Sequence, residues 1–157
     1  MQFENVVQEE TFGRLEEYLS ELFDDPFFDA ETAHFYVRYG STVLEISVDP
    51  YGPEEANVEV VAYCVQGVDP REELLLGLLE LNHELPIGAF SLVGRDIFVS
   101  HSIFGRSVSR SSLITAISAV ATVSDDYDDR IVQRYGGQTA LERIRDTGGR
   151  KKRAAVK

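Results

Sequence analysis

Residues 70–104 read PREELLLGLLELNHELPIGAFSLVGRDIFVSHSIF and decide the fold. The first half predicts a helix: Asp69 is a favoured N-cap, Pro70 suits the first helical position, and Glu72 is spaced for a capping box. Leucines recur along it at helical spacing, and Pro86 ends it. The second half predicts two strands joined by a tight turn. The stretch therefore predicts a helix followed by a hairpin.

Three runs of alternating apolar residues precede this helix, and such alternation is typical of strands with one buried side. The apolar positions are Phe35, Val37 and Tyr39, then Leu44, Ile46 and Val48, then Val58, Val60, Ala62 and Cys64. Gly40 and Ser41 predict a tight hairpin between the first two runs. Residues 49–53 predict a longer exposed loop before the third run.

Helical patterns flank these strands. Residues 9–24 repeat apolar side chains at helical spacing with glutamates on the other side, and the pattern leaves residues 1–8 undecided. A long helix is predicted over residues 109–135, closed by the two glycines that follow. Thr139 and Glu142 are spaced to cap a short helix after it.

The order of elements is helix, three strands, helix, two strands and helix, with hairpins between most strands. This order predicts an α+β fold with a largely antiparallel sheet. We expect one domain over residues 1–147, because 157 residues with 43% hydrophobic content suit a single core. Residues 148–157 form a short basic tail without apolar anchors, and such termini are expected to be disordered.

Four short signatures accompany this order: Leu81-Asn82 ends the middle helix, Gly88-Ala-Phe90 opens the next strand, Asp96-Ile-Phe-Val begins its partner, and Gly136-Gly137 follows the long helix. With them the chain resembles the YbjN-like family over residues 9–137. The resemblance implies the fold of the type III secretion chaperones and a small, acidic, dimeric, peptide-binding or regulatory protein without catalysis. The basic tail departs from those chaperones, and no residue identifies a secretion system or an effector.

Charge divides the chain unevenly. Residues 143–157 hold seven of the 15 basic residues and one of the 27 acidic residues, so the body keeps eight basic and 26 acidic side chains, a formal charge of −18. A surface this negative repels phosphate backbones and attracts basic segments. We therefore expect a protein or peptide partner for the acidic body and no nucleic acid.

The compartment is predicted from one cysteine and two missing signals. Cys64 lies in an alternating apolar run, which indicates a small buried hydrophobe in a reducing compartment. The amino terminus lacks a basic segment followed by an apolar one, and no apolar run approaches the roughly 20 residues of a membrane helix. The expected location is the cytoplasm, without membrane contact.

Two groups of residues offer metal chemistry. The four potential zinc ligands occupy separate elements without the usual close pairs: His34, His83, His101 and Cys64. Residues 125–129 contain the DDxxD pattern of prenyl-transfer enzymes, which hold magnesium in a large all-helical cavity. We interpret this run as a solvated helix face with Tyr127 inward, partly neutralised by Arg130 and Arg134. No metal or other cofactor is expected.

No catalytic motif is present either. The serines between residues 100 and 112 form neither a GxSxG elbow nor an SxxK pair. No glycine-rich loop joins a strand to a helix in the way phosphate sites require. The sequence therefore predicts a protein that is not an enzyme.

A second apolar set lies opposite core positions on two strands and supplies the candidate partner-binding residues: Val61, Tyr63, Val65, Phe98 and Phe104. A sheet face that is fully exposed to solvent is expected to carry polar side chains, so these apolar residues indicate that the second face is covered. Helices of the same chain cover the second face, a dimer buries it, or a ligand segment binds there. The sequence leaves these three options open.

These observations predict a non-catalytic protein- or peptide-binding module, chaperone-like or regulatory, that acts as a homodimer. Apolar contact within an acidic shell would hold the bound segment. One alternative is a structural or regulatory protein that binds a folded partner. Another is a magnesium-dependent enzyme built on residues 125–129.

Overall fold

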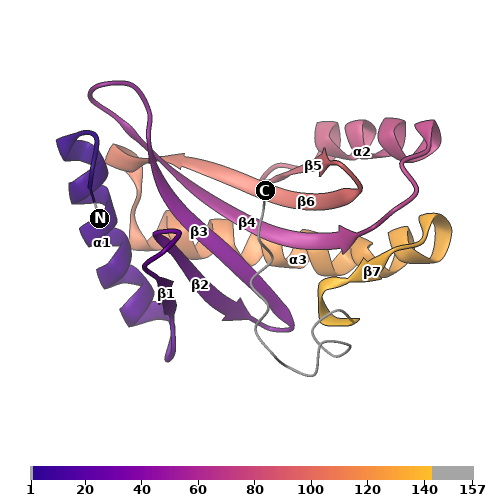
Figure 1. Ribbon diagram of the computed structural model, residues 1–157, viewed down its shortest axis with the longest axis horizontal. Coiled ribbons are helices and arrows are strands. Elements are labelled where there is room, and N and C mark those ends of the chain that lie inside the picture. The colour runs from indigo at the N-terminus through magenta and orange to yellow at the C-terminus, as the bar shows by residue number, and fades with distance from the viewer. Residues whose placement is uncertain (1, 143–157) are drawn as a thin grey trace.

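The computed structural model describes residues 2–142, which form helices packed against one antiparallel sheet (Figure 1). The elements in chain order are α1 (Val6–Leu22), β1 (Phe27–Asp29), β2 (His34–Tyr39), β3 (Thr42–Pro50), β4 (Ala56–Gln66), α2 (Glu72–Glu84), β5 (Ala89–Val93), β6 (Asp96–Phe104), the 3₁₀ turn η1 (Gly105–Ser107), α3 (Arg110–Tyr135) and β7 (Gln138–Thr139). The predicted succession of helix, three strands, helix, hairpin and long helix is present.

The strands pair in the order β1-β2-β3-β4-β6-β5, and β7 pairs separately with β4. Every neighbouring pair is antiparallel. The chain leaves the sheet after β4, forms α2, and returns at the far edge through β5. This arrangement confirms the predicted α+β class with an antiparallel sheet.

One face of the sheet carries the core. The register places the apolar side chains of the alternating runs on this face, where Leu44, Ile46, Val58, Val60 and Ala62 are all 0% exposed. The side chains that cover them from α1 and α3 are equally buried: Leu15, Leu19, Leu113, Ile117 and Val120. Burying an aliphatic side chain of this size contributes roughly 1.5–3 kcal/mol, so this layer supplies much of the stability.

Side chains next to α1 and α3 set where these helices begin and end. Asn5 caps α1 by accepting a hydrogen bond of 2.8 Å from the Gln8 amide, and the helix therefore starts earlier than the apolar pattern predicts. Ser109 and Ser112 form a reciprocal capping box at the start of α3. Gly136, at φ 73°, ends α3 where the sequence predicts.

The start of α2 differs from the prediction. Its N-cap is Arg71, and no side chain caps the helix, so the predicted cap at Asp69 with Pro70 in the first turn is wrong. The Asp69 carboxylate lies 3.3 Å from Arg71 Nε, and the Asp69 carbonyl accepts from the Arg71 amide at 2.8 Å. The chain therefore makes a turn at Asp69 before the first helical residue, Glu72.

Two short strands were not predicted. β1 follows Pro26 and brings Phe28 against Phe12 of α1 and Phe35 of β2, with ring centroids 5.6 and 4.9 Å apart. β7 is only two residues long and pairs with β4 opposite Val65. Neither has enough residues for an alternating pattern, and both form through tertiary contacts.

The predicted cap after β7 is present. The Thr139 amide donates to Glu142 Oε2 at 2.9 Å, and the Glu142 amide donates to Thr139 Oγ1 at 3.2 Å. The predicted basic tail over residues 148–157 lies outside the described residues. Among residues 2–142, no helix has both the length and the apolar run needed to cross a bilayer.

Candidate partner-binding surface

The described helices leave one face of the sheet without a helical cover. α1 and α3 pack on the core face, with α3 running behind the sheet in Figure 1, and α2 lies beside the edge strand β5 and against the end of α3. We call the opposite side the helix-free face. Its residues alternate with core positions on four adjacent strands: His34, Tyr36, Glu45, Ser47, Asp49, Glu59, Val61, Tyr63, Phe98 and Ser100.

Three predicted binding residues come together on this face. Tyr63 and Phe98 are directly opposite each other on β4 and β6, and their rings meet edge to face with centroids 5.0 Å apart. Val61 lies two residues along β4, opposite Ser100, and is half-buried. They form an apolar strip across the neighbouring strands β4 and β6, although Phe98 is itself only 9% exposed.

The other two predicted residues are not part of this strip. Val65 is 0% exposed, because the register between β4 and β6 shifts between Tyr63 and Val65 and turns the Val65 side chain away from the helix-free face. Simple alternation along β4 does not reveal this bulge. Phe104 pairs with Asn57, which pairs with Asp49, so it lies on the helix-free face but at the far end of β6. There it is 56% exposed, and its ring lies 5.8 Å from that of Tyr51.

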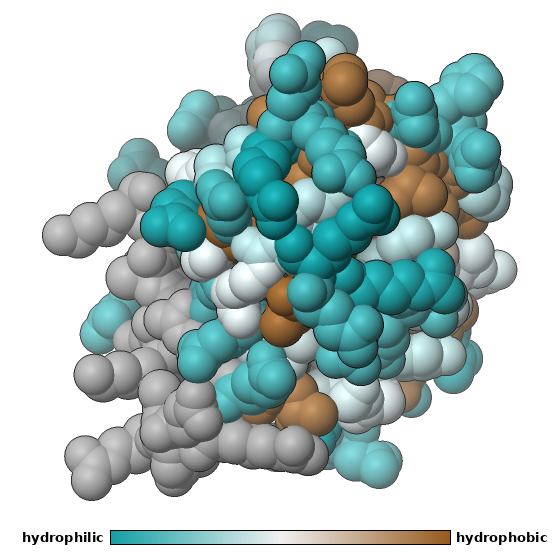
Figure 2. Space-filling model, turned by 90° about the vertical axis from the view of Figure 1, so that its right-hand side faces the viewer, coloured by the Kyte–Doolittle hydropathy of each residue, from teal (hydrophilic) through white to brown (hydrophobic). Residues whose placement is uncertain are grey.

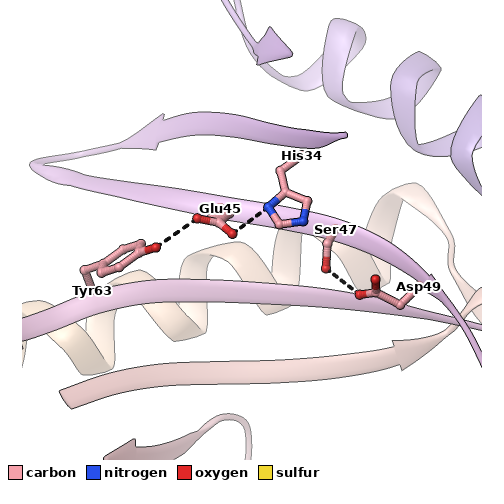
Figure 3. A network of polar contacts seen from close by, with 5 residues as sticks. All are labelled: His34, Glu45, Ser47, Asp49 and Tyr63. Atoms are coloured by element: carbon pink, nitrogen blue, oxygen red, sulfur yellow. Dashed lines mark hydrogen bonds and ion pairs between the residues drawn. The ribbon is translucent and has the colours of Figure 1, made fainter. Parts of the chain in front are cut away.

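A polar network that the sequence analysis missed borders the apolar strip (Figure 3). His34 Nδ1 lies 2.7 Å from Glu45 Oε1, and the Tyr63 hydroxyl donates to Glu45 Oε2 at 3.0 Å. These side chains come from β2, β3 and β4, so Glu45 links three neighbouring strands. On the same strand the Ser47 hydroxyl donates to Asp49 Oδ2 at 2.8 Å.

A sequence signal for this network exists. Glu45, Ser47 and Asp49 alternate with the core residues of β3, so they share the face opposite the core once that strand is accepted. The cross-strand partners of Glu45 depend on the registers of two strand pairs. Alternation within one strand does not define those registers.

The carboxylates of the helix-free face affect one another. Burial raises the pKa of Glu59, and the nearby charges of Asp49 and Glu45 raise it further. Burial also raises the pKa of the Tyr36 hydroxyl, with Glu45 as the next cause. A cation placed on this face would reduce the repulsion between these carboxylates.

The potential zinc ligands remain apart. Across residues 2–142, no three histidine, cysteine or acidic side chains gather in a way that could hold a metal ion. Cys64 is buried, its thiol donates to the Ser124 carbonyl of α3 at 3.6 Å, and burial raises the pKa of that thiol to about 12. It is therefore a packing residue, as predicted, with little thiolate at neutral pH.

The acidic run over residues 125–129 contacts the sheet. The Thr42 hydroxyl donates to Asp125 Oδ1 at 2.6 Å, joining α3 to the first residue of β3. Arg134 pairs with Glu73 of α2 at 2.7 Å, and the Arg130 guanidinium lies over the Tyr127 ring. Within residues 2–142, no ion pair joins either arginine to Asp126 or Asp129, so the neutralisation of the acidic run predicted from the sequence is not present.

α2 provides a second exposed apolar surface. Leu74 and Leu78 are buried, whereas Leu76 and Leu79 are 53% and 66% exposed, although the helical spacing of the leucines places Leu79 in the predicted apolar stripe. Figure 2 views this end of the molecule and shows hydrophobic surface among hydrophilic side chains. A shallow groove of about 340 Å³ runs between α2 and α3 and has Tyr127 in its lining.

A protein-family model described as "T3SS (YopN, CesT) and YbjN peptide-binding chaperone 1" matches residues 10–143. The chain belongs to this family. The resemblance noted over residues 9–137 is thereby confirmed. No curated protein matches the chain.

Solved structures support the fold assignment. A chain in the HopA1-SchA chaperone-effector complex has 14% identity, a TM-score of 0.59, and coverage of 78% of this chain and 94% of its own. A chain in the ExsC-ExsE complex has 10% identity, a TM-score of 0.59, and coverage of 79% and 95%. A chain in the structure of the Yersinia pestis type III secretion chaperone SycH in complex with a stable fragment of YscM2 has 13% identity, a TM-score of 0.56, and coverage of 74% and 98%. At these identities the similarity establishes the fold alone.

Proposed function

We propose that this chain is a non-catalytic module that binds an extended segment of a partner protein on its helix-free face. The observation that carries the proposal is the packing of α1 and α3 on one side of the sheet, which leaves Val61 and Tyr63 beside the carboxylates of Glu45 and Glu59. An extended peptide presents side chains to one face at every second residue, which matches the spacing of a sheet surface. Apolar side chains would contact the strip, and basic ones the carboxylates.

Two further observations support this proposal. The chain belongs to a family of peptide-binding chaperones, and HopA1-SchA is described as a chaperone-effector complex. The acidic body has a formal charge of −18 outside residues 143–157, which favours a segment with basic residues.

Cys64, a single buried thiol, supports a cytoplasmic location.

We also propose that the protein is a homodimer joined through α2. Leu76 and Leu79 expose more than half of their surface on the same helix, and such adjacent leucines are costly to leave in water. A contact between two copies of α2 would cover them and leave the helix-free face available. Leu79→Glu is expected to give a monomer in sedimentation analysis. Val6→Glu, at a 67% exposed position on α1, is the matched control that should keep the dimer.

The binding proposal can be tested with a display library of short segments from the organism's own proteins. Segments that bind the full chain are then examined by hydrogen exchange. We expect slower exchange along β4 and β6, and affinity at least tenfold weaker in Val61→Asp. Val6→Asp introduces the same charge on α1 and should bind normally.

Other outcomes would contradict this proposal. Protection confined to the groove between α2 and α3 would place the ligand elsewhere. Retention of only folded proteins, with no isolated segment bound, would favour the alternative of a folded partner. Equal affinity of Val61→Asp and Val6→Asp would exclude the helix-free face as the binding surface.

A further inference from the structure

The helix-free face has an excess of negative charge. Besides Glu45, Asp49 and Glu59, the strand registers place Asp29 of β1 and Asp96 of β6 on this side of the sheet, whereas Arg38 of β2 is the permanently charged base that they place there. Glu45 and Glu59 lie on adjacent strands, two residues apart along the paired register. Burial is the largest cause of the raised pKa of Glu59, and the charges of Asp49 and Glu45 raise it further because like charges share this surface.

The chain itself carries the complementary charge. Residues 143–157 lie outside the described part of the structure, but their sequence has seven basic residues and one acidic residue. Four of the basic residues are consecutive at positions 150–153. The rest of the chain contains no lysine, so basic charge is concentrated in this segment.

The basic segment begins close enough to reach this face. β7 pairs with Val65 of β4 on the edge of β4 opposite β6. β3 pairs with the same edge of β4 only as far as Ala62, so β7 lies beyond the end of β3. The chain therefore leaves the sheet beside β3 and β4. Glu59 is six residues from Val65 along β4, a distance of about 20 Å at the rise of a strand. Eight extended residues, 143–150, span roughly 26 Å. Residues 150–153 can therefore reach Glu59 and Glu45.

We propose that basic residues 150–153 bind the helix-free face of their own chain, against Glu45 and Glu59. Attachment to the same chain gives the segment a high effective concentration, on the order of millimolar for a short flexible linker, so weak contacts suffice. Exposed ion pairs contribute little individually and are screened by salt, so the contact would be reversible. If the proposed function is correct, this segment competes with a ligand segment for the same surface.

A spin label in the full chain tests the contact without any ligand. Ala155→Cys places the label beyond the basic residues and keeps their charges, while the native Cys64 is 1% exposed, with its thiol pKa raised to about 12, and should not react. We expect the label to broaden the amide signals of Glu45, Glu59 and Val61. The broadening should fall several-fold at 1 M salt, where the screening length is about 3 Å.

Charge variants of the labelled chain give the decisive comparison. The double variant Glu45→Gln, Glu59→Gln should lose the broadening, and Glu80→Gln, Glu84→Gln, the same charge change on α2, should keep it. Normal amide spectra would show that each variant is folded. Absence of broadening on β3 and β4, equal broadening in both double variants, or broadening only between labelled and unlabelled molecules would overturn the proposal.

Competition is measured separately with the segments from the display library. Replacing residues 150–153 by glutamine in the full chain should increase the affinity for a bound segment several-fold. Unchanged affinity would show that the basic residues do not compete for the surface. If the library yields no binding segment, the proposed function fails, while the spin-label result still decides whether the basic residues lie on the sheet.

Discussion

The Asn82 side chain bonds to both backbone groups of Phe90. Asn82 Nδ2 donates to the Phe90 carbonyl at 3.0 Å, and Asn82 Oδ1 accepts from the Phe90 amide at 2.7 Å. β5 is an edge strand, so these bonds supply pairing partners that a further strand would otherwise provide. They also fix α2 to the sheet. Asn82 and Phe90 each belong to one of the short signatures that carry the family resemblance. Their contact gives a physical reason why the two signatures occur together.

Asn82→Ala should destabilise the protein by about 1–3 kcal/mol, because it leaves a half-buried amide and carbonyl without these partners. The change can be measured by urea unfolding. His83→Ala alters the neighbouring exposed position on α2 and is the control, with little change expected. Equal stability of the two variants would show that water replaces the Asn82 bonds at no cost.

Asp125 links α3 to the start of β3 through Thr42, so Asp125→Ala should destabilise the fold. The expected loss is only about 1 kcal/mol, because the carboxylate is exposed. Asp126→Ala removes the same charge from the next position and serves as the control. Thermal unfolding at neutral pH measures both. A larger loss for Asp126→Ala would contradict the structural role assigned to Asp125.

Gly137 lies at φ 92°, and a Cβ there would come within 2.5 Å of the Gln66 carbonyl oxygen. Gly137→Ala should therefore cost at least about 2 kcal/mol and disturb the pairing of β7 with β4, because backbone strain and overlap combine. Gly13→Ala in α1 meets no atom within 4 Å and should stabilise the helix by about 0.5–1 kcal/mol. The melting temperature is therefore expected to fall in Gly137→Ala and to rise in Gly13→Ala.

Asp128 predicts a pH dependence. Burial, followed by the charges of Asp129 and Asp125, raises the pKa of Asp128 from 3.8 to about 6 in the folded protein. As the pH rises from 3.8 to about 6, Asp128 loses its proton in the unfolded state before it does so in the folded state. Asp128 therefore lowers the free energy of unfolding progressively over this range, and the whole loss is present above about pH 6. Asp128→Asn should be more stable than the native chain at pH 7.5.

This stabilisation should disappear near pH 4, where the carboxyl is largely protonated in the folded state. Chemical unfolding at the two pH values measures it. Asp126→Asn, an exposed position on the same helix, controls for the loss of one charge. A stability difference for Asp128→Asn that is the same at both pH values would contradict the assigned titration.

Local patterns predicted the elements that are long enough to repeat. The alternation of Leu44, Ile46 and Val48 predicted β3, and the helical spacing that includes Leu113 and Ile117 predicted α3. β1 and β7 are too short to show a period, and the absent cap at Asp69 depends on how that residue turns toward Arg71. Such features arise from contacts that adjacent residues do not specify.

The same distinction applies to the candidate surface. The sequence by itself determined that Val61 and Tyr63 lie opposite the core residues of β4, because side chains on a strand alternate between its two faces. Only the tertiary structure decided that Val65 turns into the core at a bulge, that Glu45 joins His34 and Tyr63, and that no described helix covers this face. These outcomes depend on register and on helix placement, which are fixed by packing between segments far apart in the chain.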